Sequence, residues 1–210
     1  QAAGLQSIRE GNRRFARVWT LGPVGRVLVP MLWDVPFTPA GGTAQTAHHA
    51  LAAEAMFRFQ DAAQALRGKT YEVHGPRDVA IWDAEKKITT CAPDGLLIER
   101  KPDGAPGIVW AVEYHNEPKA GRAKDKIESY DRLVRHEDAW QAAWGVETFP
   151  KVLVVWRHEP VLRDYARQLR TLAGQRGDRA VAFSSLALSD SLSSVDGAVR
   201  VKKIGAQTHE

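Results

Sequence analysis

Two acidic residues stand at the ends of predicted β-strands, where their carboxylates could share a cation. Asp94 comes directly before the apolar run Gly95–Ile98, and Glu113 directly follows the run Ile108–Val112. If the two runs pair as an antiparallel hairpin, the start of one lies beside the end of the other. Neighbouring carboxylates repel each other unless a cation neutralises them, and hard oxygen ligands favour Mg²⁺ or Mn²⁺. The same pattern also fits two unrelated acids at strand ends.

A lysine on the next predicted helix could bring a positive charge to these acids. At 100° per residue, Lys126 falls on the apolar face that carries Tyr130 and Leu133, whereas Lys124 points away from that face. The stem of Lys126 could follow the edge of the core until its ammonium reaches solvent. Alternatively, the ammonium could hold an attacking water or a phosphate beside the two acids.

Two further polar residues are candidates for the same site. His115 follows Glu113 by two positions, and a histidine can ligate a softer metal or act as a base. It could equally be a strand-end side chain without a role. Glu54 lies at the edge of the apolar face of an earlier predicted helix, where a glutamate is typically a solvated flank.

Three arginines follow one face of a later predicted helix. Arg163, Arg167 and Arg170 lie opposite apolar residues, namely Leu162, Tyr165, Leu169 and Leu172. A charged outer face is usual for an amphipathic helix, but arginines at this spacing could also follow a phosphate backbone. The surrounding segment, residues 151–180, contains seven Lys and Arg against three Asp and Glu.

Helical periodicity predicts three long helices that would carry several of these residues. The first covers Thr43–Leu66, which lacks Gly and Pro and is rich in alanine. The second covers Arg122–Trp144, and the third covers Pro160–Ala173 and is expected to end at Gly174.

Short apolar or β-branched runs bounded by Gly, Pro or Asp predict the strands. Five runs are expected to form an antiparallel meander: Thr70–His74, Val79–Trp82, Lys87–Cys91, Gly95–Glu99 and Ile108–Tyr114. Lys151–Trp156 is almost wholly apolar, which is typical of a strand buried on both faces. Val181–Phe183 is predicted as a last short strand before a serine-rich, partly structured tail. This order predicts an α/β fold with a mixed central sheet flanked by helices.

The first 40 residues are predicted to form a separate segment. Arg17–Leu21 is expected to be a strand that a turn at Gly22-Pro23 ends. Residues 33–42 contain two prolines and two glycines, as a linker does. We therefore expect a boundary near residue 40, which separates residues 1–40 from a larger domain at 41–210.

Composition bounds the class of protein. The chain has 210 residues, of which 44% are hydrophobic and 26% charged, and these proportions argue against a disordered or collagen-like chain. We expect no membrane span and see no signal peptide, because no apolar run is long enough and no basic segment precedes one.

The single cysteine, Cys91, predicts a reducing compartment, by default the cytoplasm. Because the first residue is Gln1 and not Met, the chain is expected to be a fragment. The net charge of +4 is a weak indication of a polyanionic partner.

Larger stretches of the sequence resemble a known family. Pro93-Asp94 and a strand ending in Glu113 resemble the PD-(D/E)xK nuclease pattern on a restriction-endonuclease-like core. The segments APDGLLI, WAVEYHNEPKAGRAKDKIESYDRLV and PKVLVVWRHEPVLRDYARQL are similar to the replication-relaxation family of plasmid and mobile-element proteins, which includes mobilisation relaxases of the MobC type. The resemblance covers about residues 44–190. Residues 14–29 also resemble the wing of a winged helix-turn-helix, so the first segment would be a remnant of such a domain.

The resemblance implies a role for each matching residue. Asp94 and Glu113 match the family's two acids and would hold Mg²⁺ or Mn²⁺. Glu54 stands where many such nucleases have a first-helix glutamate, as a third metal ligand. Lys126 and Tyr130 match the family's K-x-x-x-Y, so the lysine would support the phosphate or the nucleophile. The tyrosine could itself attack the phosphate or belong to the core.

His115 departs from the pattern, because the nuclease pattern has lysine at this position and the relaxation family usually has aspartate. A histidine there removes a hard ligand, although it can still act as a base. The residues expected to be catalytic are therefore Asp94, Glu113, His115 and Lys126, and the arginine face would bind DNA.

The resemblance implies a DNA-processing protein that nicks or cleaves DNA with a metal ion in replication initiation or mobilisation. One alternative is a DNA-binding accessory protein that keeps the fold without the chemistry. Another is a protein-interaction subunit of such a system. Besides DNA, the expected partners are a second copy of the chain or other replication or mobilisation proteins.

Overall fold

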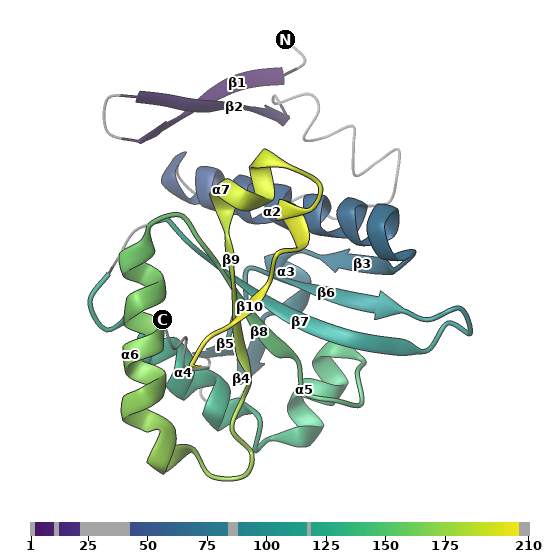
Figure 1. Ribbon diagram of the computed structural model, residues 1–210, viewed down its shortest axis with the longest axis vertical. Coiled ribbons are helices and arrows are strands. Elements are labelled where there is room, and N and C mark those ends of the chain that lie inside the picture. Colours follow the sequence, from purple (N-terminus) through teal and green to yellow (C-terminus); the bar gives the residue numbers. More distant parts are fainter. Residues whose placement is uncertain (1–2, 11–12, 22–42, 84–87, 117–118, 206–210) are drawn as a thin grey trace. The chain divides into compact units, whose positions relative to one another are not determined.

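The computed structural model describes residues 3–10, 13–21, 43–83, 88–116 and 119–205 (Figure 1). The chain divides into two compact units, Gln1–Leu51 and Ala52–Glu210. Helix α2, Thr43–Arg67, crosses the division and ends one residue beyond the predicted helix. The predicted boundary near residue 40 lies outside the described residues.

The first unit contains an antiparallel hairpin. Strand β1, Ala3–Glu10, pairs with β2, Arg13–Leu21, so that Ala3 lies opposite Leu21 and Glu10 lies opposite Arg13. The predicted strand Arg17–Leu21 is the second half of β2, so sequence periodicity missed β1 and the start of β2. The predicted turn and linker lie outside the described residues, and the winged-helix remnant stays a prediction.

The second unit is built on a six-stranded mixed sheet in the order β10-β9-β8-β7-β6-β3. Its strands are β3 Thr70–His74, β6 Gly95–Arg100, β7 Pro106–His115, β8 Lys151–Trp156, β9 Phe183–Ala187 and β10 Lys202–Lys203. β7, β8 and β9 run parallel, and the outer strands pair antiparallel. The α/β fold with a mixed sheet between helices is thus confirmed.

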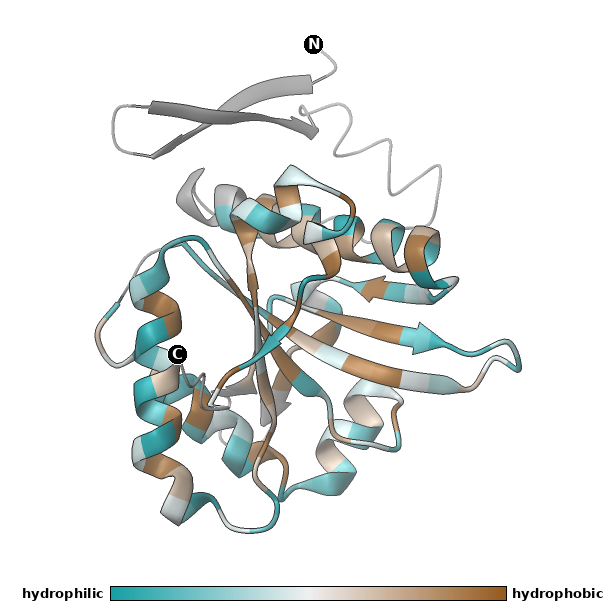
Figure 2. Cartoon of the chain, in the orientation of Figure 1, coloured by the Kyte–Doolittle hydropathy of each residue, from teal (hydrophilic) through white to brown (hydrophobic). Residues whose placement is uncertain are grey.

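Hydrophobic residues run along the central strands of this sheet (Figure 2). On one face, Val109 and Ala111 of β7 join a core that also contains residues of α4 (Arg122–Leu133), α5 (Glu137–Trp144) and α6 (Glu159–Arg176). On the other face, α2 packs so closely that a Cβ at Gly95 would lie 2.5 Å from Met56 Sδ and 2.7 Å from the His74 carbonyl oxygen. Glycine is therefore required at the residue that follows Asp94.

The predicted second helix is two helices. α4 ends at Leu133, and His136 has the non-helical backbone angles φ −104° and ψ 69° before α5 begins. The break places Glu137 and Asp138 in a new first helical turn, where the helix dipole favours acidic side chains. It also lets Trp144 Nε1 donate to the Val79 carbonyl oxygen at 2.8 Å.

The predicted five-stranded meander is wrong. β4, Ile81–Asp83, and β5, Ile88–Cys91, form a separate two-stranded sheet, while β3, β6 and β7 belong to the main one. Val79 ends the short helix α3, Pro76–Val79, instead of starting a strand. The Pro at the start of this helix explains the difference, because proline suits the first helical turn.

The C-terminal region is more ordered than its composition predicts. α6 continues through Gly174 to Arg176 and ends where Gly177 has a positive φ of 64°. The predicted strand Val181–Phe183 overlaps β9 only at Phe183. β9 is followed by α7, Leu188–Ser193, the 3₁₀ turn Gly197–Val199 and β10. Ser184 and Ser185 of β9 are buried, and Ser185 Oγ donates to the Lys202 carbonyl oxygen at 3.4 Å.

Among the described residues, no helix combines the length and the apolar character that a membrane span requires.

A buried ion pair ties α4, α6 and the approach to β9 together. Arg176 Nε and Nη2 donate to the two carboxylate oxygens of Asp131 at 2.8 and 3.1 Å, and Nη2 also donates to the Val181 carbonyl oxygen. The guanidinium lies 5.5 Å from the centre of the Phe183 ring. Since both charged side chains are largely buried, each depends on the other for compensation.

We expect Asp131→Asn to lower the free energy of unfolding by about 3 kcal/mol, because it leaves Arg176 buried without its counter-charge. Urea denaturation at neutral pH measures the loss. Glu128→Gln on the same helix is the matched control, since its pair with Lys124 is long, 3.8 Å, and exposed; it should cost under about 1 kcal/mol. Equal losses of stability for the two variants would show that the pair of Asp131 and Arg176 contributes no more than an exposed ion pair.

Candidate active site

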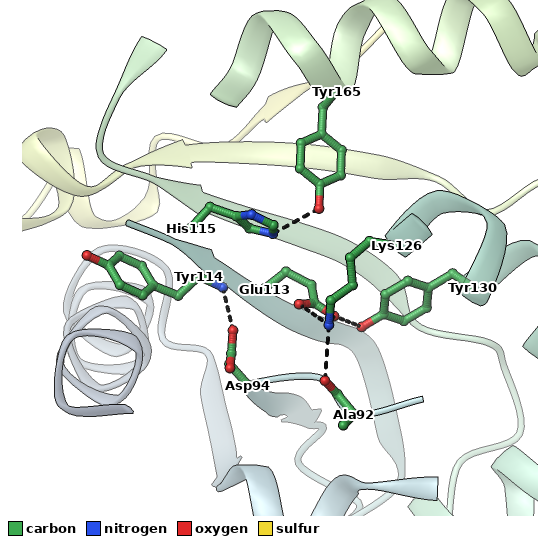
Figure 3. Close-up of polar contacts among 8 residues, drawn as sticks. All are labelled: Ala92, Asp94, Glu113, Tyr114, His115, Lys126, Tyr130 and Tyr165. Carbon is green, nitrogen blue, oxygen red and sulfur yellow. Dashed lines mark hydrogen bonds and ion pairs between the residues drawn. The ribbon is translucent and has the colours of Figure 1, made fainter. Parts of the chain in front are cut away.

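Asp94 and Glu113 lie at the same end of two adjacent strands of the main sheet, where β7 ends and β6 begins. The Asp94 backbone N–H donates to the Val112 carbonyl oxygen at 2.8 Å. Figure 3 shows the second contact, in which the Asp94 carboxylate Oδ2 accepts from the Tyr114 backbone N–H at 2.8 Å. The Asp94 carboxylate thus binds the backbone next to Glu113. The hairpin that the sequence predicts is confirmed. Ligands of open α/β sheets typically bind outside the carboxyl ends of parallel strands, as at this end of β7.

Glu113 is a buried acid whose carboxylate is held by α4. Only 1% of the residue is exposed, and Lys126 Nζ lies 2.8 Å from Oε1 and 2.7 Å from Oε2. The same ammonium donates to the Ala92 carbonyl oxygen at 3.2 Å. The orientation that helical periodicity predicts for Lys126 is confirmed, and Lys124 is exposed as expected.

Tyr130 completes the contacts drawn around Glu113 in Figure 3. Its hydroxyl donates to Glu113 Oε1 at 2.8 Å, and the side chain is fully buried. The burial raises the pKa of the Tyr130 phenol well above its ordinary value, and the charge of Glu113 raises it further. A buried phenol with a raised pKa is a poor nucleophile, so the structure favours a core role that also orients the carboxylate.

Burial dominates the electrostatics of the pair. It raises the pKa of Glu113 to about 7, and the charge of Asp94 adds to the increase while Lys126 opposes it. Burial lowers the pKa of Lys126, but the charge and hydrogen bond of Glu113 outweigh it, and the net shift is upward. With a pKa near neutral, the Glu113 carboxyl exists in both protonation states around pH 7, and a nearby positive charge favours the ionised state.

His115 lies on the same face of β7 as Glu113 but contacts a different helix. It is 2% exposed, and its Nε2 lies 2.9 Å from the Tyr165 hydroxyl of α6. The two rings meet edge to face, 5.3 Å apart at their centres. The Tyr165 hydroxyl thus contacts one imidazole nitrogen of His115. The sequence pattern identified Tyr165 only as part of the apolar face of α6.

Glu54 does not join Asp94 and Glu113. It is exposed on α2, where its carboxylate accepts from Arg58 Nε at 2.6 Å one helical turn away. Among the described residues, no three His, Cys, Asp or Glu side chains gather closely enough to hold a metal ion together. The prediction of a third metal ligand at Glu54 is therefore corrected, because α2 packs on the face of the sheet opposite to Glu113.

The predicted DNA-binding arginines are exposed along α6, and acids accompany two of them. Arg163 Nη2 lies 3.1 Å from Glu159, and Arg167 pairs with Asp164. Both arginine side chains remain about 70% exposed, and such surface pairs contribute little energy. The arginines stay available to a stronger anion, while Tyr165 and Leu169 on the opposite face are buried as expected.

A hollow of about 360 Å³ opens beside Lys126. Its described lining comprises Cys91, Ala92, Lys119, Ala120, Arg122, Asp125, Lys126 and Ser129. Cys91 is buried, and burial raises the pKa of its thiol to about 12, with a further increase from Glu113. A thiol with so high a pKa is not a nucleophile at neutral pH, which leaves oxygen ligands and cations as the reactive groups of this region.

The donor atoms suit a hard divalent cation. Asp94 and Glu113 could supply carboxylate oxygens. Burial is the main cause of the raised pKa of Glu113, the charge of Asp94 adds to it, and a cation bound at the two carboxylates would oppose both effects. Lys126 already supplies one positive charge at Glu113.

No protein-family model, no curated protein and no solved structure matches this chain.

The raised pKa of Glu113 makes a prediction about stability. Between pH 5 and pH 8 the unfolded chain ionises this carboxyl, whereas the folded protein retains its proton up to about pH 7, so rising pH favours unfolding. We expect the free energy of unfolding of the wild type to fall by about 3 kcal/mol more than that of Glu113→Gln over this range. Urea titrations in EDTA at several pH values measure the difference. Parallel pH profiles would show that burial does not shift this group.

Proposed function

We propose that Asp94, Glu113 and Lys126 form the active site of a nuclease that nicks or cleaves DNA with Mg²⁺ or Mn²⁺. The observation that carries the proposal is the buried Glu113 carboxylate, held by Lys126 directly beside the strand end at which Asp94 lies. Burying an acid with a lysine is costly, and active sites are where such perturbed groups gather.

Each residue has a distinct role in this proposal. Asp94 and Glu113 would hold the metal ion, which would activate water and stabilise charge that develops on the phosphate. Lys126 reaches Glu113 from α4 and borders the hollow, so its ammonium can contact a phosphate that enters there. Tyr130 keeps the Glu113 carboxylate oriented through its hydrogen bond.

The resemblance of the sequence to the replication-relaxation family supports the finer form of the proposal. It would make the main sheet a restriction-endonuclease-like core of the PD-(D/E)xK type. The protein would then act in the cytoplasm in replication initiation or mobilisation of a plasmid or mobile element. Arg163, Arg167 and Arg170 on α6 would contact the DNA backbone.

A specific observation favours an alternative, a DNA-binding accessory protein without catalysis. Both carboxylate oxygens of Glu113 lie within hydrogen-bonding distance of Lys126, and His115, which replaces the usual lysine or aspartate, contacts Tyr165. If the lysine holds the carboxylate permanently, the site is a structural ion pair.

Comparing two lysine variants tests the role of Lys126. Lys126→Met keeps the apolar stem and removes the charge. Because burial raises the pKa of Glu113 to about 7, the carboxyl can keep a proton when its counter-charge is lost, so the protein should fold while nicking of supercoiled DNA with Mn²⁺ falls about 100-fold. Lys124→Met is the matched control on the exposed side of α4 and should nick as the wild type does. Equal rates would show that Lys126 has no part in the chemistry. A wild type inactive with both Mg²⁺ and Mn²⁺ would favour the accessory protein.

Metal binding can be measured without DNA. We expect saturating Mn²⁺ to raise the melting temperature of the wild type by several degrees, because a ligand of the folded state stabilises it. Asp94→Asn should abolish the increase, and Asp178→Asn, an exposed acid outside the site, should retain it. An increase that persists in Asp94→Asn would place the metal elsewhere.

A further inference from the structure

We propose that the hollow beside Lys126 and a second hollow along α6 form one groove that binds a single strand of DNA. In this groove, Lys119 and Arg122 hold the phosphate backbone between the active site and the arginines of α6. The proposal rests on the proposed function for its substrate, and it adds the strand state, the path and two residues that the sequence did not single out.

The two hollows share part of their lining. The second has a volume of about 620 Å³ and is bordered by Lys119, Ala120, Pro160, Arg163, Asp164, Ala166, Arg167 and Arg170. The hollow beside Lys126 is also bordered by Lys119 and Ala120. A ligand that leaves the first hollow past Lys119 therefore enters the second.

The lining of the groove is strongly basic. Across both hollows it contains six Lys and Arg and two acids: Lys119, Arg122, Lys126, Arg163, Arg167 and Arg170 against Asp125 and Asp164. One of these acids, Asp164, is paired with Arg167. Among the described residues, none of the lining side chains is aromatic. The groove therefore suits phosphates more than stacked bases, and binding should depend little on sequence.

Arg122 lies where the two hollows approach each other. It is the first residue of α4, its backbone N–H donates to the Lys119 carbonyl oxygen at 3.2 Å, and it borders the hollow beside Lys126. A phosphate that passes between the hollows would meet Lys119 and Arg122 together.

The size of the hollows suits a single strand. Hollows of 360 and 620 Å³ have the volume of small-molecule sites, so each offers room for individual nucleotides of a strand that is not base-paired. The second hollow has Lys119 on one segment and arginines on another, so a phosphate inside it is approached by cations from two sides. Arg163 to Arg170 spans about 10 Å of helix, enough for a few successive phosphates.

Binding can be tested in EDTA, where no cleavage is needed. The probe is a fluorescein-labelled twelve-residue oligothymidine, compared with the same strand in a duplex, by fluorescence anisotropy over a range of NaCl concentrations. We expect the single strand to bind at least tenfold more tightly than the duplex. The double variant Lys119→Gln, Arg122→Gln should reduce the slope of log K against log salt by about 1.4, or 0.7 for each lost phosphate contact.

The control is Lys202→Gln, Lys203→Gln, which makes the same charge change on exposed residues of β10 and should leave the slope unchanged. Thermal melting checks that each variant is folded. Tighter binding of the duplex, no binding of either DNA, or the same slope in the two double variants would overturn the proposal. If the groove variants behave as expected but no metal supports nicking, the groove stands and the nuclease fails. If nicking occurs with an unchanged slope, only the groove fails.

Discussion

Glu113 is an acidic side chain in the interior of the protein, and its burial imposes requirements on its surroundings. A carboxylate at 1% exposure needs opposite charge and hydrogen bonds close by. Lys126 and Tyr130 supply them from two successive turns on one face of α4. The helix must therefore begin just after β7 and lie across the end of that strand. The position of α4, and of the hollow that its first turns border, follows from the compensation of one charge.

Two further contacts fix the position of α6 relative to this site. Tyr165 meets His115 of β7 near one end of the helix, and Arg176 meets Asp131 of α4 at the other end. The inward face of α6 is thus fixed by specific partners, while Arg163, Arg167 and Arg170 remain on the outward face. A helix anchored at both ends can present cations at a constant distance from Glu113. Under the proposed function, these outward arginines would contact the DNA backbone from a helix whose position is fixed.

Local sequence patterns were sufficient where neighbours along the chain determine the structure. Alternation and turn residues predicted the hairpin of β6 and β7, because such strands pair with the nearest partner. Helical periodicity predicted that Lys126 and not Lys124 points inward. The same reasoning failed at His136, where α4 and α5 separate, and in the serine-rich region that forms β9 and α7. There the packing of tryptophans and the pairing with β8 outweigh local preference.

Residue spacing thus established an α/β fold, a pair of strand-end acids and an inward lysine, since each depends on contacts within one element or between adjacent ones. Spacing could not establish that His115 contacts Tyr165, 50 positions later, or that Lys119 borders the same hollow as Arg170. Nor could it exclude Glu54, because the face of the sheet that α2 covers depends on the course of the whole chain. Those features arise only when distant segments pack together, as burial of apolar surface on both sides of one sheet brings α2 to one face and α4 and α6 to the other.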